Sequence, residues 1–139
     1  LEVSDNLKGN AVVTELGHDV CMQIAAMNPQ YLNRDSVPAE VVEHEKEILM
    51  AQTINEGKPE AVAQKIVSGR INKFFEENCL VDQAFVKENK TSVSKYVDAK
   101  AKELGGTISI KNFVRFEKGE GLAKREDDFA AEVAAMAKK

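Results

Sequence analysis

The short Gly57-Lys58-Pro59 junction constrains the fold of this chain more than any other feature of its sequence. Glycine is favoured just past the carboxyl end of a helix and proline in the first turn of the next one. The junction therefore predicts a helix over residues 37–56, with Ser36 as its N-cap, and a second helix over residues 59–77. Helices joined this briefly lie antiparallel, with arms about 28 Å long at 1.5 Å per residue.

Both arms are charged outside a narrow apolar stripe, which predicts a projecting antiparallel coiled coil rather than a core element. The stripe of the first arm is interrupted, because His44 and Glu45 stand where a compact core would place leucine. The stripe residues are Val37, Val41, Ile48 and Leu49 in the first arm, and Val62, Ala63, Ile66, Val67, Phe74 and Phe75 in the second.

The rest of the chain mixes helices with extended segments. Apolar residues at three- and four-residue steps predict a helix over residues 10–27, and another over 92–104 that Thr91 or Ser92 caps. Alternating apolar residues predict a strand over 107–117. The inner faces of the two helices are predicted to be Val13, Leu16, Val20, Ile24 and Met27, and Val93, Tyr96, Val97 and Ala101.

Shorter signals complete this part. Residues 1–4 alternate like the end of a strand already under way, so we expect the natural start to lie upstream. Residues 78–88 read as extended, and Glu88-Asn89-Lys90 as a polar loop. Cys21, close to the apolar face of its helix, is expected to be a small core residue. The fold class predicted is α+β: a small antiparallel sheet packed with helices, a projecting helical hairpin and a C-terminal amphipathic helix.

The C-terminal segment, joined to the rest through Gly119-Glu120-Gly121, is rich in alanine and predicts a helix. Phe129, Val133 and Met136 follow one another at four- and three-residue steps and share one face. About 12 residues are too few for a stable isolated helix. We therefore expect this face to bind a partner, either the chain's own core or another protein.

Charge and composition exclude several classes of protein. Lysine plus arginine number 19 and aspartate plus glutamate 23, a net charge of −4 that argues against a dedicated nucleic-acid surface and against anionic membranes. No apolar run is long enough to span a bilayer and no signal peptide is visible. Two cysteines cannot form a disulfide framework, so we expect a reducing, cytoplasmic setting.

No constellation of residues points to catalysis, a metal or a cofactor. His44-Glu45 lacks the second histidine of a zinc motif, and His18 with Cys21 supplies two ligands where three or four are needed. Gly119-Glu120-Gly121 lacks the lysine of a phosphate-binding loop and reads as a hinge. The residues thus favour a non-enzymatic interaction module.

Several ordered segments resemble the bacterial elongation factor Ts family, over residues from about 10 to 139. The resemblance rests on their order and spacing rather than on a single motif. The segments are Ile24-Ala25-Ala26 with Asn28-Pro29, Val37-Pro38-Ala39-Glu40-Val41-Val42-Glu43, Asn55-Glu56-Gly57-Lys58-Pro59, Ile66-Val67-Ser68-Gly69-Arg70, Gln83-Ala84-Phe85-Val86, Val114-Arg115-Phe116-Glu117, Gly119-Glu120-Gly121 and Asp128-Phe129-Ala130-Ala131-Glu132-Val133-Ala134-Ala135-Met136.

The resemblance implies a guanine-nucleotide exchange factor that binds elongation factor Tu and lets GDP leave, without a cofactor and without binding nucleotide itself. It implies that residues 1–36 and 78–118 form the second half of the family's core. Residues 37–77 would be the helical hairpin that serves self-association, with a homodimer as one possible product. Residues 119–139 would be the C-terminal module that packs on the partner's nucleotide-binding domain.

The resemblance also assigns site residues. Phe85-Val86 match a Phe-Val strand end that approaches the partner's third domain, whereas Lys87 replaces an apolar residue of some members. The implied tail anchors are Phe129, Val133 and Met136, and the implied self-association residues are Val41, Ile48, Ile66 and Val67. The family's Thr-Asp-Phe-Val motif and its N-terminal helical domain have no counterpart in this sequence and would precede Leu1.

Three other interpretations remain open. The chain could be a structural module that dimerises through the hairpin without an exchange role. An enzyme would require a cleft with perturbed acids near His18 or His44. An RNA adapter would use Lys65, Arg70 and Lys73, but acidic neighbours dilute this charge.

Overall fold

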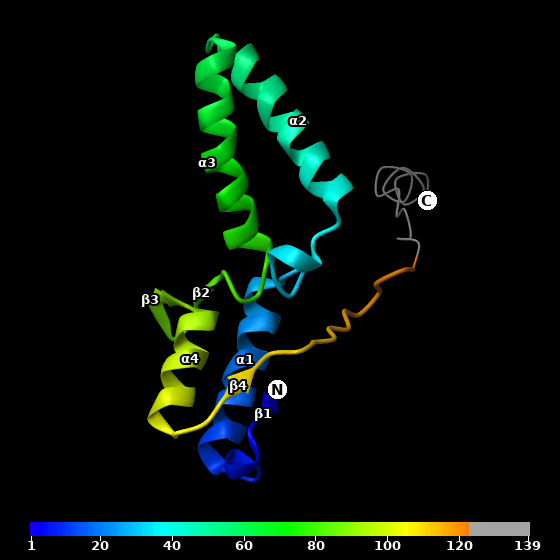
Figure 1. Ribbon diagram of the computed structural model, residues 1–139. Coiled ribbons are helices and arrows are strands. Elements are labelled where there is room, and N and C mark those ends of the chain that lie inside the picture. The colour runs from blue at the N-terminus through cyan, green and yellow to red at the C-terminus, as the bar shows by residue number, and fades with distance from the viewer. Residues whose placement is uncertain (123–139) are drawn as a thin grey trace, which may run out of the picture.

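The computed structural model describes residues 1–122, so the predicted tail helix with Phe129, Val133 and Met136 lies outside the described residues. Figure 1 shows a helical hairpin rising from a body of two further helices and short strands. The elements are β1 (Glu2–Val3), a 3-10 turn (Asp5–Leu7), α1 (Ala11–Met27), a 3-10 turn (Arg34–Ser36), α2 (Ala39–Asn55), α3 (Glu60–Asn78), β2 (Ala84–Phe85), β3 (Glu88–Ser92), α4 (Val93–Glu103) and β4 (Ile108–Ser109). The predicted α+β class is confirmed.

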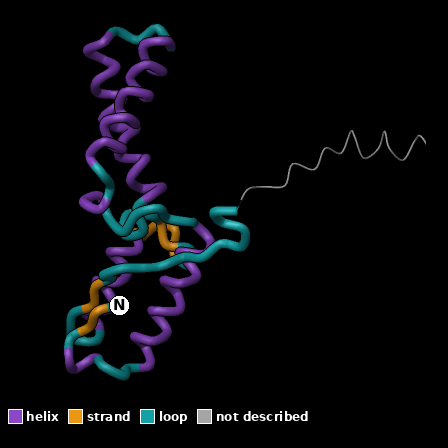
Figure 2. Tube along the Cα trace, turned by 90° about the vertical axis from the view of Figure 1, so that its right-hand side faces the viewer, coloured by secondary structure: helices purple, strands orange, loops and turns teal. Residues whose placement is uncertain are grey.

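The core lies between α1 and α4, which run side by side in opposite directions (Figures 1 and 2). Side chains of one face of each helix meet there, as their periodicity predicts, and the loops on either side close the core. Its buried members are Leu7, Leu16, Val20, Ile24, Leu80, Phe85, Val93, Val97, Ala101 and Ile108. Asn10 and Ser92 cap the two helices, because each side-chain oxygen accepts a backbone N–H of the first turn.

Two residues predicted to face this core do not. Cys21 is exposed, because it follows Val20 by one residue and is therefore turned about 100° away from the buried stripe of α1. Met27, at the last position of the helix, is also exposed. The other cysteine, Cys79, is fully buried. Burial raises the pKa of its thiol to about 11, and the nearby Asp82 carboxylate adds to the rise.

The described residues contain two small antiparallel sheets. In the first, Glu2 of β1 faces Ser109 of β4 and Val3 faces Ile108. The strand predicted over residues 107–117 is therefore wrong in its length, because only Ile108–Ser109 meets a partner strand. An extended segment becomes a strand only when a neighbour takes up its backbone hydrogen bonds.

The second sheet joins β2 to β3, and its register pairs Phe85 with Glu88 across a bulge. Val86 and Lys87 form the two-residue connection. The loop predicted at residues 88–90 is wrong, since these residues begin β3. Their polar side chains are exposed, so the strand lacks the apolar alternation that would have marked it in the sequence.

The predicted antiparallel hairpin is confirmed (Figure 1). Gly57 adopts φ +80°, the left-handed conformation that glycine tolerates best, and so ends the first arm. Thr53 and Ala63 are fully buried within the hairpin. Ser36 is not the N-cap of α2: it closes a capping box with Asn33 in the preceding 3-10 turn, and Pro38 occupies the cap position.

Arg34 joins the base of the hairpin to the body. Its Nε donates to Asp82 Oδ2 (3.2 Å) and its Nη1 donates to Asn72 Oδ1 of α3 (3.2 Å). The guanidinium carbon also lies 5.1 Å from the centre of the Phe75 ring, within the range of a cation–π contact. One side chain thus ties α3 to the loop that leads into β2.

Candidate functional site

Phe85 and Val86, the adjacent residues predicted to meet a partner, lie in different surroundings. Phe85 is 1% exposed and belongs to the core. Its ring stacks on that of Tyr96 from α4, with 4.2 Å between centroids and 26° between planes. Val86 is 39% exposed at the turn between β2 and β3. Of this pair, only Val86 presents its side chain to solvent. The buried Phe85 anchors the turn that carries Val86 to the core.

Two contacts with α1 hold this turn. The Val86 N–H donates to Gln23 Oε1 (2.8 Å), and the Lys87 ammonium pairs with Asp19 Oδ1 (2.5 Å). Asp19 is 5% exposed, so its carboxylate is buried, whereas the side chain of its partner Lys87 is 47% exposed. The hydrogen bond that Lys87 donates to Asp19 raises the pKa of the lysine. Lys87 therefore helps to hold the turn against α1.

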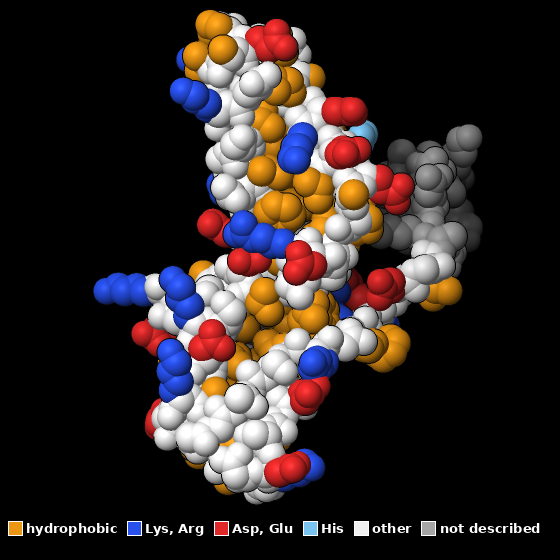
Figure 3. Space-filling view, viewed as in Figure 1, with side chains coloured by type: hydrophobic (Ala, Val, Ile, Leu, Met, Phe, Trp, Pro, Cys, Tyr) orange, Lys and Arg blue, Asp and Glu red, His pale blue; other side chains and the backbone are white. Residues whose placement is uncertain are grey.

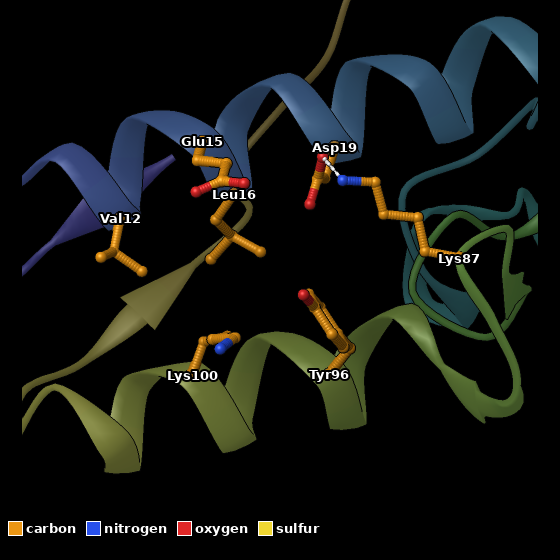
Figure 4. Close-up of a pocket in the computed structure, with 7 residues that line it drawn as sticks. All are labelled: Val12, Glu15, Leu16, Asp19, Lys87, Tyr96 and Lys100. Atoms are coloured by element: carbon orange, nitrogen blue, oxygen red, sulfur yellow. Dashed lines mark ion pairs between the residues drawn. The ribbon is translucent and has the colours of Figure 1, made fainter.

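A small cavity lies beside the turn, between α1 and α4 (Figure 4). Its volume is about 110 Å³, well below the roughly 300–1,000 Å³ of ordinary small-molecule pockets. Lys100, at its edge, pairs with Glu103 (2.8 Å), and this bond raises the pKa of the lysine. The lining residues are Val12, Glu15, Leu16, Asp19, Lys87, Tyr96 and Lys100. The cavity is too small to enclose an ordinary small-molecule ligand.

The four hairpin residues predicted to mediate self-association also differ in exposure. Val67 is buried between the arms, Val41 and Ile66 are half-buried, and Ile48 is exposed. Exposed Ile54 lies in a shallow apolar groove with Met50 and Ala51 on α2, rimmed by Lys46 and Glu47. Figure 3 shows apolar side chains gathered along the hairpin on the face in view.

A second apolar surface follows β4. Val114 is mostly exposed, and Phe116 is 91% exposed. Together with residues of α1 they line an open groove of about 410 Å³. The alternation in the sequence identified these residues as strand-like, but it did not reveal that they stand out from the body. The groove is lined by Cys21, Ile24, Ala25, Val114, Arg115, Phe116, Glu117 and Lys118.

Sequence reasoning missed Asp19 and Gln23, whose polar side chains are buried at the turn. Polar residues inside the apolar stripe of α1 were the available signal, since Asp19 follows Leu16 and Gln23 follows Val20 by three residues. Over residues 1–122, no group of three or more His, Cys, Asp or Glu side chains is arranged to hold a metal ion. Within the same range, no helix is both long and apolar enough to cross a bilayer.

Comparison with known proteins gives one consistent result. The sequence model of the family described as Elongation factor TS matches residues 3–120. A Clostridium kluyveri protein named Elongation factor Ts is 49% identical over 126 residues, and a Clostridium botulinum protein of the same name is 52% identical over 126 residues. Each match covers 91% of this chain but 41% of the relative, so the chain spans less than half the length of these relatives.

Proposed function

The chain belongs to the elongation factor Ts family, and from that premise we propose that it binds elongation factor Tu and promotes the release of GDP during translation. The observation that carries the proposal is the family match over residues 3–120, joined to an exposed Val86 turn on a buried support. We place this activity in the cytoplasm, where elongation factor Tu works.

Such a function needs no catalytic acid or base. A protein accelerates nucleotide release when it binds the nucleotide-free partner more tightly than the GDP-bound partner, because a ligand shifts an equilibrium only through its differential affinity. Protein contacts supply that difference. The exposed side chain of Val86 and the small size of the neighbouring cavity are compatible with such contacts.

We propose separate roles for three regions of the chain. Residues 1–36 and 78–118 form the part of the core that presents the Val86 turn. Residues 37–77 form the hairpin, and residues 119–139 form a module that docks on the nucleotide-binding domain of elongation factor Tu. Phe129, Val133 and Met136 are the proposed anchors of that module.

The decisive experiment is the release of fluorescent GDP from elongation factor Tu with this chain titrated in. Acceleration supports exchange. Competition against an intact exchange factor without acceleration indicates docking alone and rejects exchange by this chain. Neither effect at high concentration rejects the proposal.

Substitutions locate the contact. Val86→Asp should weaken binding at least tenfold, about 1.4 kcal/mol, because a charge would enter an apolar contact. Val62→Asp is the matched control, since Val62 is also an exposed valine but lies on the hairpin. Phe129→Ala should weaken binding without lowering the stability of the body. Equal binding by Val86→Asp and wild type would remove the turn from the interface.

Self-association through the hairpin is the second candidate function. The exposed apolar groove at Met50, Ala51 and Ile54 favours it, because a helix face of this kind is suited to pack against another helix. Light scattering of the chain with and without Ile54→Glu tests it. A monomer at all concentrations rejects this function while leaving exchange intact.

A further inference from the structure

Two glutamines, Gln23 of α1 and Gln83 just before β2, are completely buried next to the Val86 turn. Buried amides are retained in folded proteins when their donors and acceptors find partners. Over residues 1–122, every buried side-chain nitrogen and oxygen has a hydrogen-bond partner. These two amides achieve this largely by bonding to each other and to the backbone around the turn.

The Gln23 amide has all of its polar groups occupied. Its Nε2 donates to Gln83 Oε1 (3.1 Å) and to the Ala84 carbonyl (3.0 Å), while its Oε1 accepts the Val86 N–H (2.8 Å). The reverse orientation of this amide would set a donor against the Val86 N–H and an acceptor against the Ala84 carbonyl. One side chain therefore holds the residues on both sides of Phe85.

The Gln83 amide continues the network to two helix ends. Its Nε2 donates to the carbonyl of Glu77 in the last turn of α3 (2.8 Å) and to the carbonyl of Met27 at the end of α1 (3.5 Å). Carbonyls in the last turn of a helix have no partner inside the helix. Gln83 thus caps two helices and at the same time orients Gln23, the one of the two amides that bonds to Val86.

We infer that Gln23 and Gln83 are positioning residues, which hold the Val86 turn in the conformation that binds the partner. The inference rests on the proposed function. Neither glutamine is exposed, so neither touches the partner. Val86 lies in the two-residue connection outside the β2–β3 ladder, and its N–H bonds to Gln23 instead. Without Gln23 the turn samples other conformations, and only the fraction of chains with the native turn can bind.

This predicts a kinetic signature that separates positioning from contact. When only a fraction of molecules is competent to bind, the apparent affinity falls by that fraction. Gln23→Met keeps the side-chain volume and removes all three hydrogen bonds, so its association rate should fall at least tenfold. Its dissociation rate should stay within twofold of wild type, because the bound complex keeps its contacts. Val86→Ala removes a contact and should instead raise the dissociation rate.

The experiment measures both rates with nucleotide-free elongation factor Tu, together with hydrogen exchange of the Val86 amide in the free chain. Exchange of that amide in Gln23→Met should accelerate at least tenfold, while exchange of the buried Val97 amide in α4 stays unchanged. Gln64→Met is the matched control, since Gln64 is exposed on α3. It should alter neither rate.

Several results would overturn the inference. These are a wild-type association rate in Gln23→Met, a change confined to its dissociation rate, or an unaltered Val86 amide. If Gln23→Met does not fold, Gln83→Met leaves Gln23 in place but unsupported, and should show the same signature at smaller size. A wild-type chain that does not bind elongation factor Tu refutes the proposed function and this inference with it. An association rate lowered only in the glutamine variants, with their dissociation rates unchanged, supports both.

Discussion

Replacing Phe85 with alanine is expected to destabilise the body of the chain rather than to remove an interface contact. The residue is 1% exposed and lies in the core with Leu16, Val93 and Val97. Its neighbour Val86 projects into solvent. The two substitutions Phe85→Ala and Val86→Ala therefore separate support from contact at adjacent positions of the chain.

The magnitude follows from the surroundings of the ring. Truncating a buried phenylalanine to alanine costs about 3–5 kcal/mol, through lost burial and the cavity left behind. The stacked pair with Tyr96 contributes roughly 0.5–1.5 kcal/mol beyond burial. Since domains of this size are stable by about 5–15 kcal/mol, Phe85→Ala removes about a fifth or more of the total. Val86→Ala should cost about 1 kcal/mol or less, because much of that side chain is already in water.

Urea denaturation followed by circular dichroism measures the difference. With a denaturant slope of about 2 kcal/mol per molar urea, the Phe85→Ala midpoint should fall by roughly 2 M. A double-mutant cycle with Phe85→Leu and Tyr96→Leu should return a coupling of about 0.5–1.5 kcal/mol for the stacked rings. A Phe85→Ala midpoint no lower than that of Val86→Ala would refute the placement of Phe85 in the core.

Three further outcomes test the packing and the buried thiol. Gly106→Ala should destabilise the chain by about 1–3 kcal/mol, because the new Cβ would lie 2.7 Å from the Leu7 side chain. In Gly69→Ala the new Cβ meets nothing within 4 Å, so this substitution should stabilise α3 by about 0.5–1 kcal/mol. Thermal unfolding compares the two variants. Ala63→Leu should cost about 1–3 kcal/mol by overpacking the hairpin, as measured by urea unfolding. The pKa of Cys79 is raised from 9.0 to about 11 in the folded chain, so the unfolded chain loses this proton first and the free energy of unfolding should fall as pH rises from about 9 to 11. Cys79→Ala should abolish that part of the pH dependence in unfolding experiments. A thiol reagent at pH 8 should label only the exposed Cys21 in the native chain.

The hairpin shows which features can be predicted from sequence. Its junction depends on the local preferences of Gly57 and Pro59, which operate within a few residues, and the structure confirms the antiparallel arms. The caps of α1 and α4 and their buried stripes are local in the same sense. The start of α2 is the exception, because Ser36 is engaged by Asn33 in a turn that the periodicity of the helix does not reveal.

The strands were harder to predict, because a segment becomes a strand only when it pairs, and β1 and β4 pair from opposite ends of the described chain. Residues 110–117 have the alternation of a strand but meet no partner among residues 1–122, while the polar start of β3 pairs with β2 and becomes one. At the site, sequence similarity pointed to Phe85 and Val86 together without indicating which of them faces outward. In the sequence, Gln23 and Asp19 are marked only as polar residues on the apolar stripe of α1. Their role at the turn depends on Val86 and Lys87, which lie more than 60 residues away.

The sequence by itself determined the positions of the helices, the hairpin and the family, because periodicity, capping and ordered family segments are properties of neighbouring residues. Only the tertiary structure decided that Phe85 supports the turn, that Val86 projects from it, and that two buried amides orient it. The physical reason is that a buried polar group takes its role from the partners that satisfy its hydrogen bonds. Those partners are brought together only when α1, the end of α3 and the β2–β3 hairpin meet.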